Sequence, residues 1–154
     1  MRTRSSAASR IAALLLLLGM AQQLTPAALA QEKFVVKPLA EKKLDQLPAG
    51  PLYWRVENFP TLAQAQAAAG PAALAAEADG KAWLFTLGAK GGATAGGQKV
   101  AEIGPIPRIT AANYLLRINS ASGGQGAKTR VHSHPGSETF YVLSGRLSEK
   151  TPQG

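Results

Sequence analysis

Cysteine is absent from the sequence, and histidine occurs only twice in 154 residues. The lack of cysteine excludes disulfide bonds, thiolate metal ligands and a cysteine nucleophile. Any site that needs several imidazoles must use both histidines. Charged residues make up 17% of the chain, below the roughly 25% typical of soluble domains. The apolar share of 45% is nevertheless ordinary for a globular protein, which argues against a wholly disordered chain.

Residues 1–30 have the three parts of a secretory signal peptide. Three arginines precede an apolar run at residues 11–20, and a stretch of small residues ends in Ala28-Leu29-Ala30. This arrangement predicts cleavage after Ala30. The alternative, a membrane anchor, needs about 20 consecutive apolar residues, and Gln22 and Gln23 interrupt the run too early. We therefore expect a periplasmic or secreted protein without a stable membrane anchor.

The basic excess of the sequence does not indicate a nucleic-acid partner. Residues 1–30 contain three of the 17 basic residues and none of the nine acidic ones, so cleavage lowers the formal charge from +8 to +5. The remaining basic residues are dispersed, with Lys42-Lys43 as the one adjacent pair. Nucleic-acid binding normally uses a clustered basic surface, so dispersed charge and export together argue against it.

Glycine and proline divide the rest of the chain into short segments, which predicts a mostly β protein of the sandwich or barrel type. Aromatic, β-branched and other apolar residues predict strands near residues 52–56, 81–87, 100–103, 113–119, 139–143 and 146–150. Ser144-Gly145 suits a two-residue hairpin turn between the last two strands, and Asp79-Gly80 suits a turn before the second.

One helix and two irregular segments complete this prediction. Thr61 can cap a short helix through about Ala69, and the alanine-rich residues 72–78 are expected to add one more helical turn. Residues 31–50 are expected to form a leader segment. Residues 88–97 contain five glycines, which predicts a mobile loop that packs little.

Both histidines and one glutamate lie within a stretch of nine residues, 130–138. Alternate side chains of a strand share a face, so His132 and His134 are expected to point the same way. Pro135-Gly136 then interrupts the strand, which lets Glu138 return its carboxylate toward the two imidazoles.

Two neutral imidazoles and a carboxylate form a ligand set for a divalent first-row metal. Imidazole suits zinc, copper, iron and nickel, and two histidines with one carboxylate are a known non-haem iron arrangement. His132, His134 and Glu138 are therefore candidate metal ligands, with Fe, Mn, Ni, Cu or Zn as the candidate ion. The alternative is two surface histidines beside a turn glutamate, because short motifs often match by chance.

Arg130 and Phe140 are candidate substrate contacts beside this site. Continued alternation from Glu138 places Phe140 on the inner face, where it would form an apolar wall. If the strand is regular from Lys128 onward, Lys128 and Arg130 share the face of His132. Basic groups there would favour an anionic small-molecule ligand. The alternative is that a bulge turns both basic side chains toward solvent.

The longer spacing around these residues resembles the first signature of the cupin superfamily. Gly126 is followed after five residues by His132, then by His134, Glu138 and, after six more residues, Gly145. The resemblance covers about residues 113–154. It implies a small antiparallel β-barrel of the jelly-roll type, with the two histidines and the glutamate as metal ligands. By the same resemblance, Gly126 and Gly145 are turn glycines.

The chain departs from the cupin pattern because the second motif, which normally supplies a fourth ligand histidine, is absent. The expected organisation is a signal peptide at 1–30, an N-terminal extension with strands and one short helix at 31–110, and the first part of a cupin-like barrel at 111–154. The barrel is then expected to be incomplete at the C-terminus, as in a fragment of a longer protein. Alternatively, residues 31–110 or a second subunit supply the missing strands.

The cupin resemblance leaves three functions open. The first is an exported metal-binding protein, with a metal-dependent oxygenase as the candidate enzyme. The second is a non-catalytic module that binds or senses a small molecule. The third is a degraded cupin whose barrel persists without a metal. Dimers are common among proteins that resemble this one, so a homodimer is an expected assembly.

Overall fold

The computed structural model describes residues 33–150. The expected signal peptide at residues 1–30 lies outside this part of the chain. The described elements, in chain order, are β1 (Val35–Leu44), β2 (Leu52–Phe59), α1 (Leu62–Ala68), β3 (Ala73–Ala78), β4 (Lys81–Gly88), β5 (Gln98–Ile106) and β6 (Tyr114–Ser122). The expectation of a mostly β protein with one short helix is therefore confirmed for these residues.

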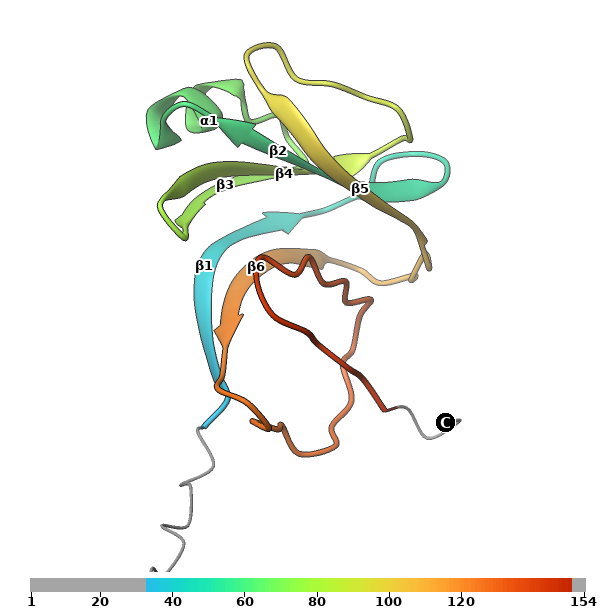
Figure 1. The fold of residues 1–154 in the computed structure, drawn as a ribbon. Helices are drawn as coiled ribbons and strands as arrows, with labels where there is room; N and C mark the ends of the chain where they lie inside the picture. The colour runs from blue at the N-terminus through green and yellow to red at the C-terminus, as the bar shows by residue number, and fades with distance from the viewer. Residues whose placement is uncertain (1–32, 151–154) are drawn as a thin grey trace, which may run out of the picture. The chain divides into compact units, whose positions relative to one another are not determined.

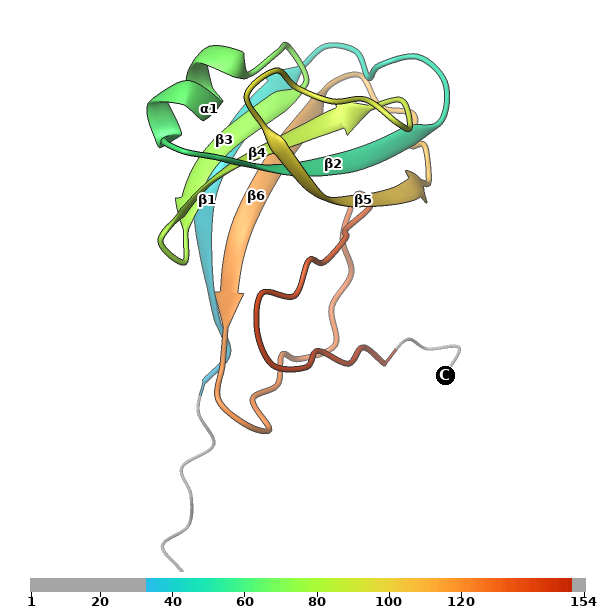
Figure 2. The same cartoon turned by 45° about the horizontal axis from the view of Figure 1, so that its top comes forward.

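The strands form two antiparallel sheets (Figures 1 and 2). One has the strand order β3-β4-β2-β5, and the other consists of β1 and β6. The first and last of the described strands thus pair with each other. Arg117 Nε donates a hydrogen bond of 2.6 Å to Glu41 Oε1 across this pair.

The four-stranded sheet is covered on both faces because its strands carry apolar residues on both. On one face, leucines from β2, β3, β4 and β6 pack together as a buried cluster, which joins the two sheets: Leu52, Leu74, Leu87 and Leu116. On the other face, Phe59 and Leu84 pack against Ala65 of α1. The sheet therefore lies between the β1-β6 pair and the helix, as Figure 1 shows.

The predicted helix is confirmed, and its start has the expected cause. Thr61 has an extended backbone, and its hydroxyl accepts a hydrogen bond of 3.2 Å from the backbone N–H of Gln64. That contact satisfies one of the N–H groups that a helix start leaves unpaired. The helix ends at Ala68, two residues before Gly70-Pro71.

The alanine-rich segment that was expected to add a helical turn is instead strand β3. The expectation is wrong because the next two residues, Asp79 and Gly80, both have positive φ angles, 51° and 66°. Such a pair makes a tight hairpin turn and returns the chain directly onto itself. β3 consequently pairs with β4 along its whole length, from Ala78 opposite Lys81 to Ala73 opposite Thr86. Pairing and burial override the helical preference of alanine.

The expected leader segment is also wrong for residues 35–44, which form β1. Every residue from Lys42 to Leu44 has a partner in β6, ending with Leu44 opposite Tyr114. The sequence of β1 did not indicate a strand because it is rich in charged residues, of which Lys37, Glu41 and Lys43 are exposed. Only Leu39, Ala40, Lys42 and Leu44 of this strand are partly buried.

The strands expected at residues 139–143 and 146–150 are not formed, and neither is the strand expected to carry the two histidines. Residues 123–150 contain no strand, and the hairpin expected around Ser144-Gly145 is absent with them. A strand is stable only when a neighbour completes its hydrogen bonds, and an isolated hairpin is marginal in water. Within the described chain, residues 139–143 have no such neighbour. Gly126 and Gly145 do have positive φ angles of 78°, in agreement with their expected place in turns.

Within residues 33–150, no helix is both long enough and apolar enough to cross a membrane.

Candidate metal site

The segment that carries both histidines bends back against the connector after β5. Ser137 Oγ donates a hydrogen bond of 3.0 Å to the backbone carbonyl of Pro107. This contact holds the bend at Pro135-Gly136 to the part of the chain that follows β5. His134 and Glu138 then lie on either side of the bend, each with about two fifths of its side chain exposed (43% and 41%). The site is thus open to solvent.

The structure brings the three predicted ligands into a chain of pairwise contacts. The ring centroids of His132 and His134 are 4.6 Å apart, with an interplanar angle of 65°. His134 Nε2 lies 3.1 Å from Glu138 Oε2. The three side chains are therefore neighbours, although no strand places them there. The predicted strand alternation is wrong, because residues 128–134 have no strand pairing.

A backbone contact fixes the role of one nitrogen in His132. Its Nδ1 lies 2.7 Å from the backbone carbonyl oxygen of Arg130. A carbonyl oxygen can only accept a hydrogen bond, so Nδ1 must carry the proton. In the neutral ring, Nε2 then has the free lone pair. Ligand histidines in proteins commonly use one nitrogen for the metal and hold the other in this way.

The donor set is chemically suited to a first-row metal, but the three groups do not converge on one point. Among residues 33–150, no group of three or more His, Cys, Asp or Glu side chains is arranged to hold one ion. The reason is visible in the contacts: Glu138 is paired directly with His134, while His132 is turned edge-to-face toward the same ring. Metal binding would replace the contact between Glu138 and His134.

The predicted substrate contacts are both exposed. Arg130 contributes its backbone carbonyl to the His132 contact, and its side chain lies in solvent together with that of Lys128. Phe140 is 46% exposed. The following residue, Tyr141, is similarly exposed at 42%, but its ring packs edge-on against the buried Trp83, with centroids 5.9 Å apart. The C-terminal segment is therefore attached to the sheet by an aromatic contact that the sequence patterns did not single out.

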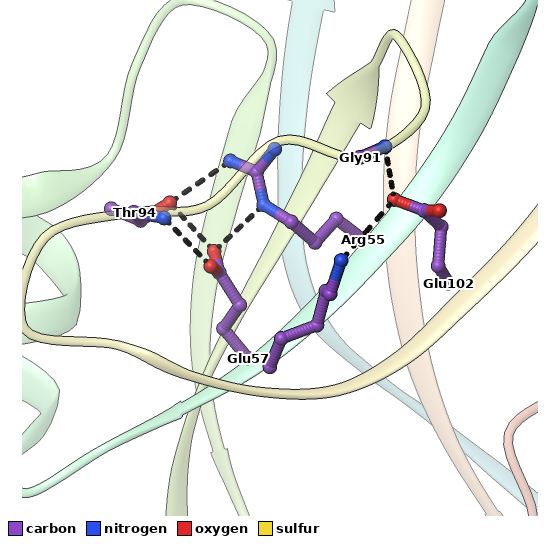
Figure 3. A network of polar contacts seen from close by, with 6 residues as sticks. Arg55, Glu57, Gly91, Thr94 and Glu102 are labelled. Atoms are coloured by element: carbon purple, nitrogen blue, oxygen red, sulfur yellow. Dashed lines mark hydrogen bonds and ion pairs between the residues drawn. The ribbon is translucent and has the colours of Figure 1, made fainter.

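A second polar cluster, also missed from the sequence, lies on β2. Glu57 is fully buried, and Arg55 Nε lies 3.0 Å from its Oε2 atom. Thr94, in the glycine-rich loop, donates to both oxygens of Glu57 (Figure 3). The signal was present in the sequence, since two opposite charges at alternate positions interrupt a largely aromatic and apolar strand, LYWRVENF.

Comparison of the chain with models of protein families, with curated proteins and with solved structures found no match.

Proposed function

We propose that this protein is an exported cupin-type protein that binds one divalent first-row metal through His132, His134 and Glu138. The observation that carries the proposal is the chain of contacts that runs from His132 to His134 and from His134 to Glu138. Two of them are the only histidines of the sequence, and the third is the glutamate that the bend at Pro135-Gly136 brings next to His134. Two imidazoles and a carboxylate are the ligand types that such metals prefer.

The solvent-exposed position of the site supports binding of a small molecule beside the metal. A three-ligand site leaves coordination positions open, and an open position is what a catalytic or ligand-binding metal needs. When bound, the metal would supply a Lewis-acidic place for an oxygen donor. The exposed Lys128 and Arg130 make an anionic molecule the favoured ligand.

Metal content of the purified protein tests the proposal. Elemental mass spectrometry is expected to find Fe, Mn, Ni, Cu or Zn in near-equimolar amount in the wild type. The double variant His132→Ala/Glu138→Ala is expected to lose this metal, because it retains only one of the three donor groups. Glu149→Gln is the matched control, since it removes an exposed carboxylate from the same segment and is expected to leave the metal content unchanged.

Two results would contradict the proposal. One is a folded wild-type protein that contains no metal after exposure to each of the five ions. The other is a double variant that binds as much metal as the wild type, which would place the metal elsewhere.

A further inference from the structure

Residues 89–97, here called the glycine strap, connect β4 to β5 and lie directly on side chains of β2. A Cβ atom added to Gly92 would overlap the Arg55 guanidinium, and one added to Gly97 would lie 2.8 Å from the ring of Phe59. The backbone of the strap therefore approaches the side chains of β2 closely at two points, Gly92 and Gly97. The expectation that this loop packs little is wrong.

Thr94 fastens the middle of the strap to the buried carboxylate of Glu57. Its backbone N–H donates a hydrogen bond of 2.8 Å to Glu57 Oε1, and its hydroxyl donates one of 2.6 Å to Oε2. The same hydroxyl accepts a hydrogen bond of 2.9 Å from Arg55 Nη2. One residue of the strap thus satisfies both oxygens of Glu57 and one donor of Arg55, as Figure 3 shows.

A second carboxylate holds the start of the strap. The backbone N–H of Gly91 donates a hydrogen bond of 2.8 Å to Glu102 Oε1 on β5, which also lies 3.8 Å from Lys99 Nζ. Both fastenings are polar contacts to strand side chains. The strap has no large apolar side chain of its own to bury, and Phe59 of β2 lies beneath Gly97.

The contacts of the strap with charged groups fix its position, but they contribute less to stability than apolar packing would. Removing a charge pair from water has a large desolvation penalty, which the attraction between the charges only partly offsets. The pairing is also incomplete. Arg55 Nε, although 3.0 Å from Glu57 Oε2, has no well-directed hydrogen bond within the described chain. Opening of the strap would return these charges to water and leave the leucine core undisturbed.

The strap also forms one wall of a groove. This groove, with a volume of about 430 Å³, lies between Ala95-Gly96 of the strap and the α1 residues Gln64, Ala67 and Ala68, with Phe59 among its lining residues. Movement of the strap away from β2 would widen the groove and expose the Phe59 ring and the Arg55 guanidinium on one face of the sheet.

We propose that the glycine strap is a lid that opens as a unit while both sheets stay folded, and that Thr94 is its fastening. The lid opens onto the face of β2 next to α1. The inference is independent of the metal site, because it concerns a different part of the chain and needs no metal.

Hydrogen exchange measured by NMR on the metal-free protein tests the lid. In the wild type, the amides of Gly91, Thr94 and Gly97 are expected to exchange faster than the amides of β2 and β4, with little dependence on denaturant, because local opening exposes little surface. Exchange of the strap amides with the same denaturant dependence as the β4 amides would overturn the proposal, since it would show opening by global unfolding.

Substitution of Thr94 tests the fastening. Thr94→Val removes the hydroxyl that contacts Glu57 and Arg55. The strap amides are therefore expected to exchange at least about tenfold faster, while the exchange rates of the β4 amides keep the same ratios to one another as in the wild type. Thr94→Ser keeps the hydroxyl and is the matched control, expected to behave as the wild type. Unchanged strap exchange in Thr94→Val, or equal acceleration in Thr94→Val and Thr94→Ser, would show that the hydroxyl is not the fastening.

Discussion

Glu57 is a carboxylate with no exposed surface, and its charge is kept by the groups around it. Burial alone raises the pKa of a carboxyl group because the charged form loses its hydration. In Glu57, hydrogen bonds from the hydroxyl and backbone N–H of Thr94, together with the Arg55 guanidinium, more than offset this effect. The pKa of Glu57 therefore lies below its usual range. A lowered pKa means that the ionised form stabilises the folded protein.

The contribution of Glu57 to stability is expected to depend on pH. Glu57→Gln should lower the free energy of unfolding by about 1–3 kcal/mol at pH 7, because it replaces one of the two accepting oxygens by an NH2 group and removes the charge paired with Arg55. The difference should persist above the unfolded-state pKa of about 4.3. It should shrink as the pH falls through the lower pKa of the folded state.

Urea denaturation of the wild type and of Glu57→Gln at several pH values between 7 and 3 measures this difference. Glu77→Gln, an exposed glutamate on β3, is the control and should have little effect at any pH. A difference for Glu57→Gln that stays constant down to pH 3 would contradict the assignment of its charged form.

At the scale of elements, local signals predict those features that depend on neighbouring residues in the sequence. Thr61 and Gly70-Pro71 mark the ends of α1 correctly, because capping is a contact within one turn. The alanines of residues 73–78 carry no comparable signal. They form a strand because the Asp79-Gly80 turn presents them with β4 as a partner. Strand identity here is a property of the pair, and the sequence of one member does not determine it.

Capping by Thr61 is expected to contribute measurably to stability. Thr61→Ala should lower the free energy of unfolding by about 1 kcal/mol, because the Gln64 N–H loses its acceptor at the helix start. Thr61→Ser retains a capping hydroxyl and should remain close to the wild type. Chemical denaturation followed by circular dichroism checks both values, and equal losses in the two variants would contradict the capping role.

The same distinction applies to the candidate site. Spacing along the sequence predicted that His132, His134 and Glu138 lie near one another, and the structure agrees. The strand that was expected to align the histidines is absent, because residues 128–134 have no pairing partner in the described chain. Proximity over seven residues is a local property, whereas alignment of donor groups on one ion requires long-range pairing. The sequence could therefore predict that the three residues lie near one another, but not how their donor groups are aligned.

At the scale of the whole described chain, the two sheets are joined by a small number of buried leucines. Leu116 of β6 is 6% exposed and packs against Leu52, Leu74 and Leu87 of the other sheet. Its neighbour Leu115 is 47% exposed on the opposite face of the same strand. The β1-β6 pair has no further strand of its own sheet, and Leu116 is the one buried residue of these two strands, with Ala40, Leu44 and Ile118 partly buried against the same cluster.

Two adjacent leucines therefore provide a matched test of how the sheets are held together. Leu116→Ala should lower the free energy of unfolding by about 2–5 kcal/mol, because it removes buried methyl groups and leaves a cavity. Leu115→Ala removes the same atoms from an exposed position and should have an effect within about 0.5 kcal/mol. Similar losses in the two variants, measured by urea denaturation, would contradict the packing of β6 on the four-stranded sheet.

Metal binding by His132, His134 and Glu138 is the central functional proposal, and the histidine rings report on it directly. The sequence contains only these two histidines, so a long-range ¹H–¹⁵N correlation spectrum has signals from two rings. On titration with Zn²⁺, we expect Nε2 of His132 and one nitrogen of His134 to shift together and to saturate at one equivalent. The use of Nε2 in His132 follows from the contact of its Nδ1 with the Arg130 carbonyl. Glu138→Gln should weaken both shifts. Spectra in which neither ring responds, or in which one ring responds without the other, would contradict a shared metal site.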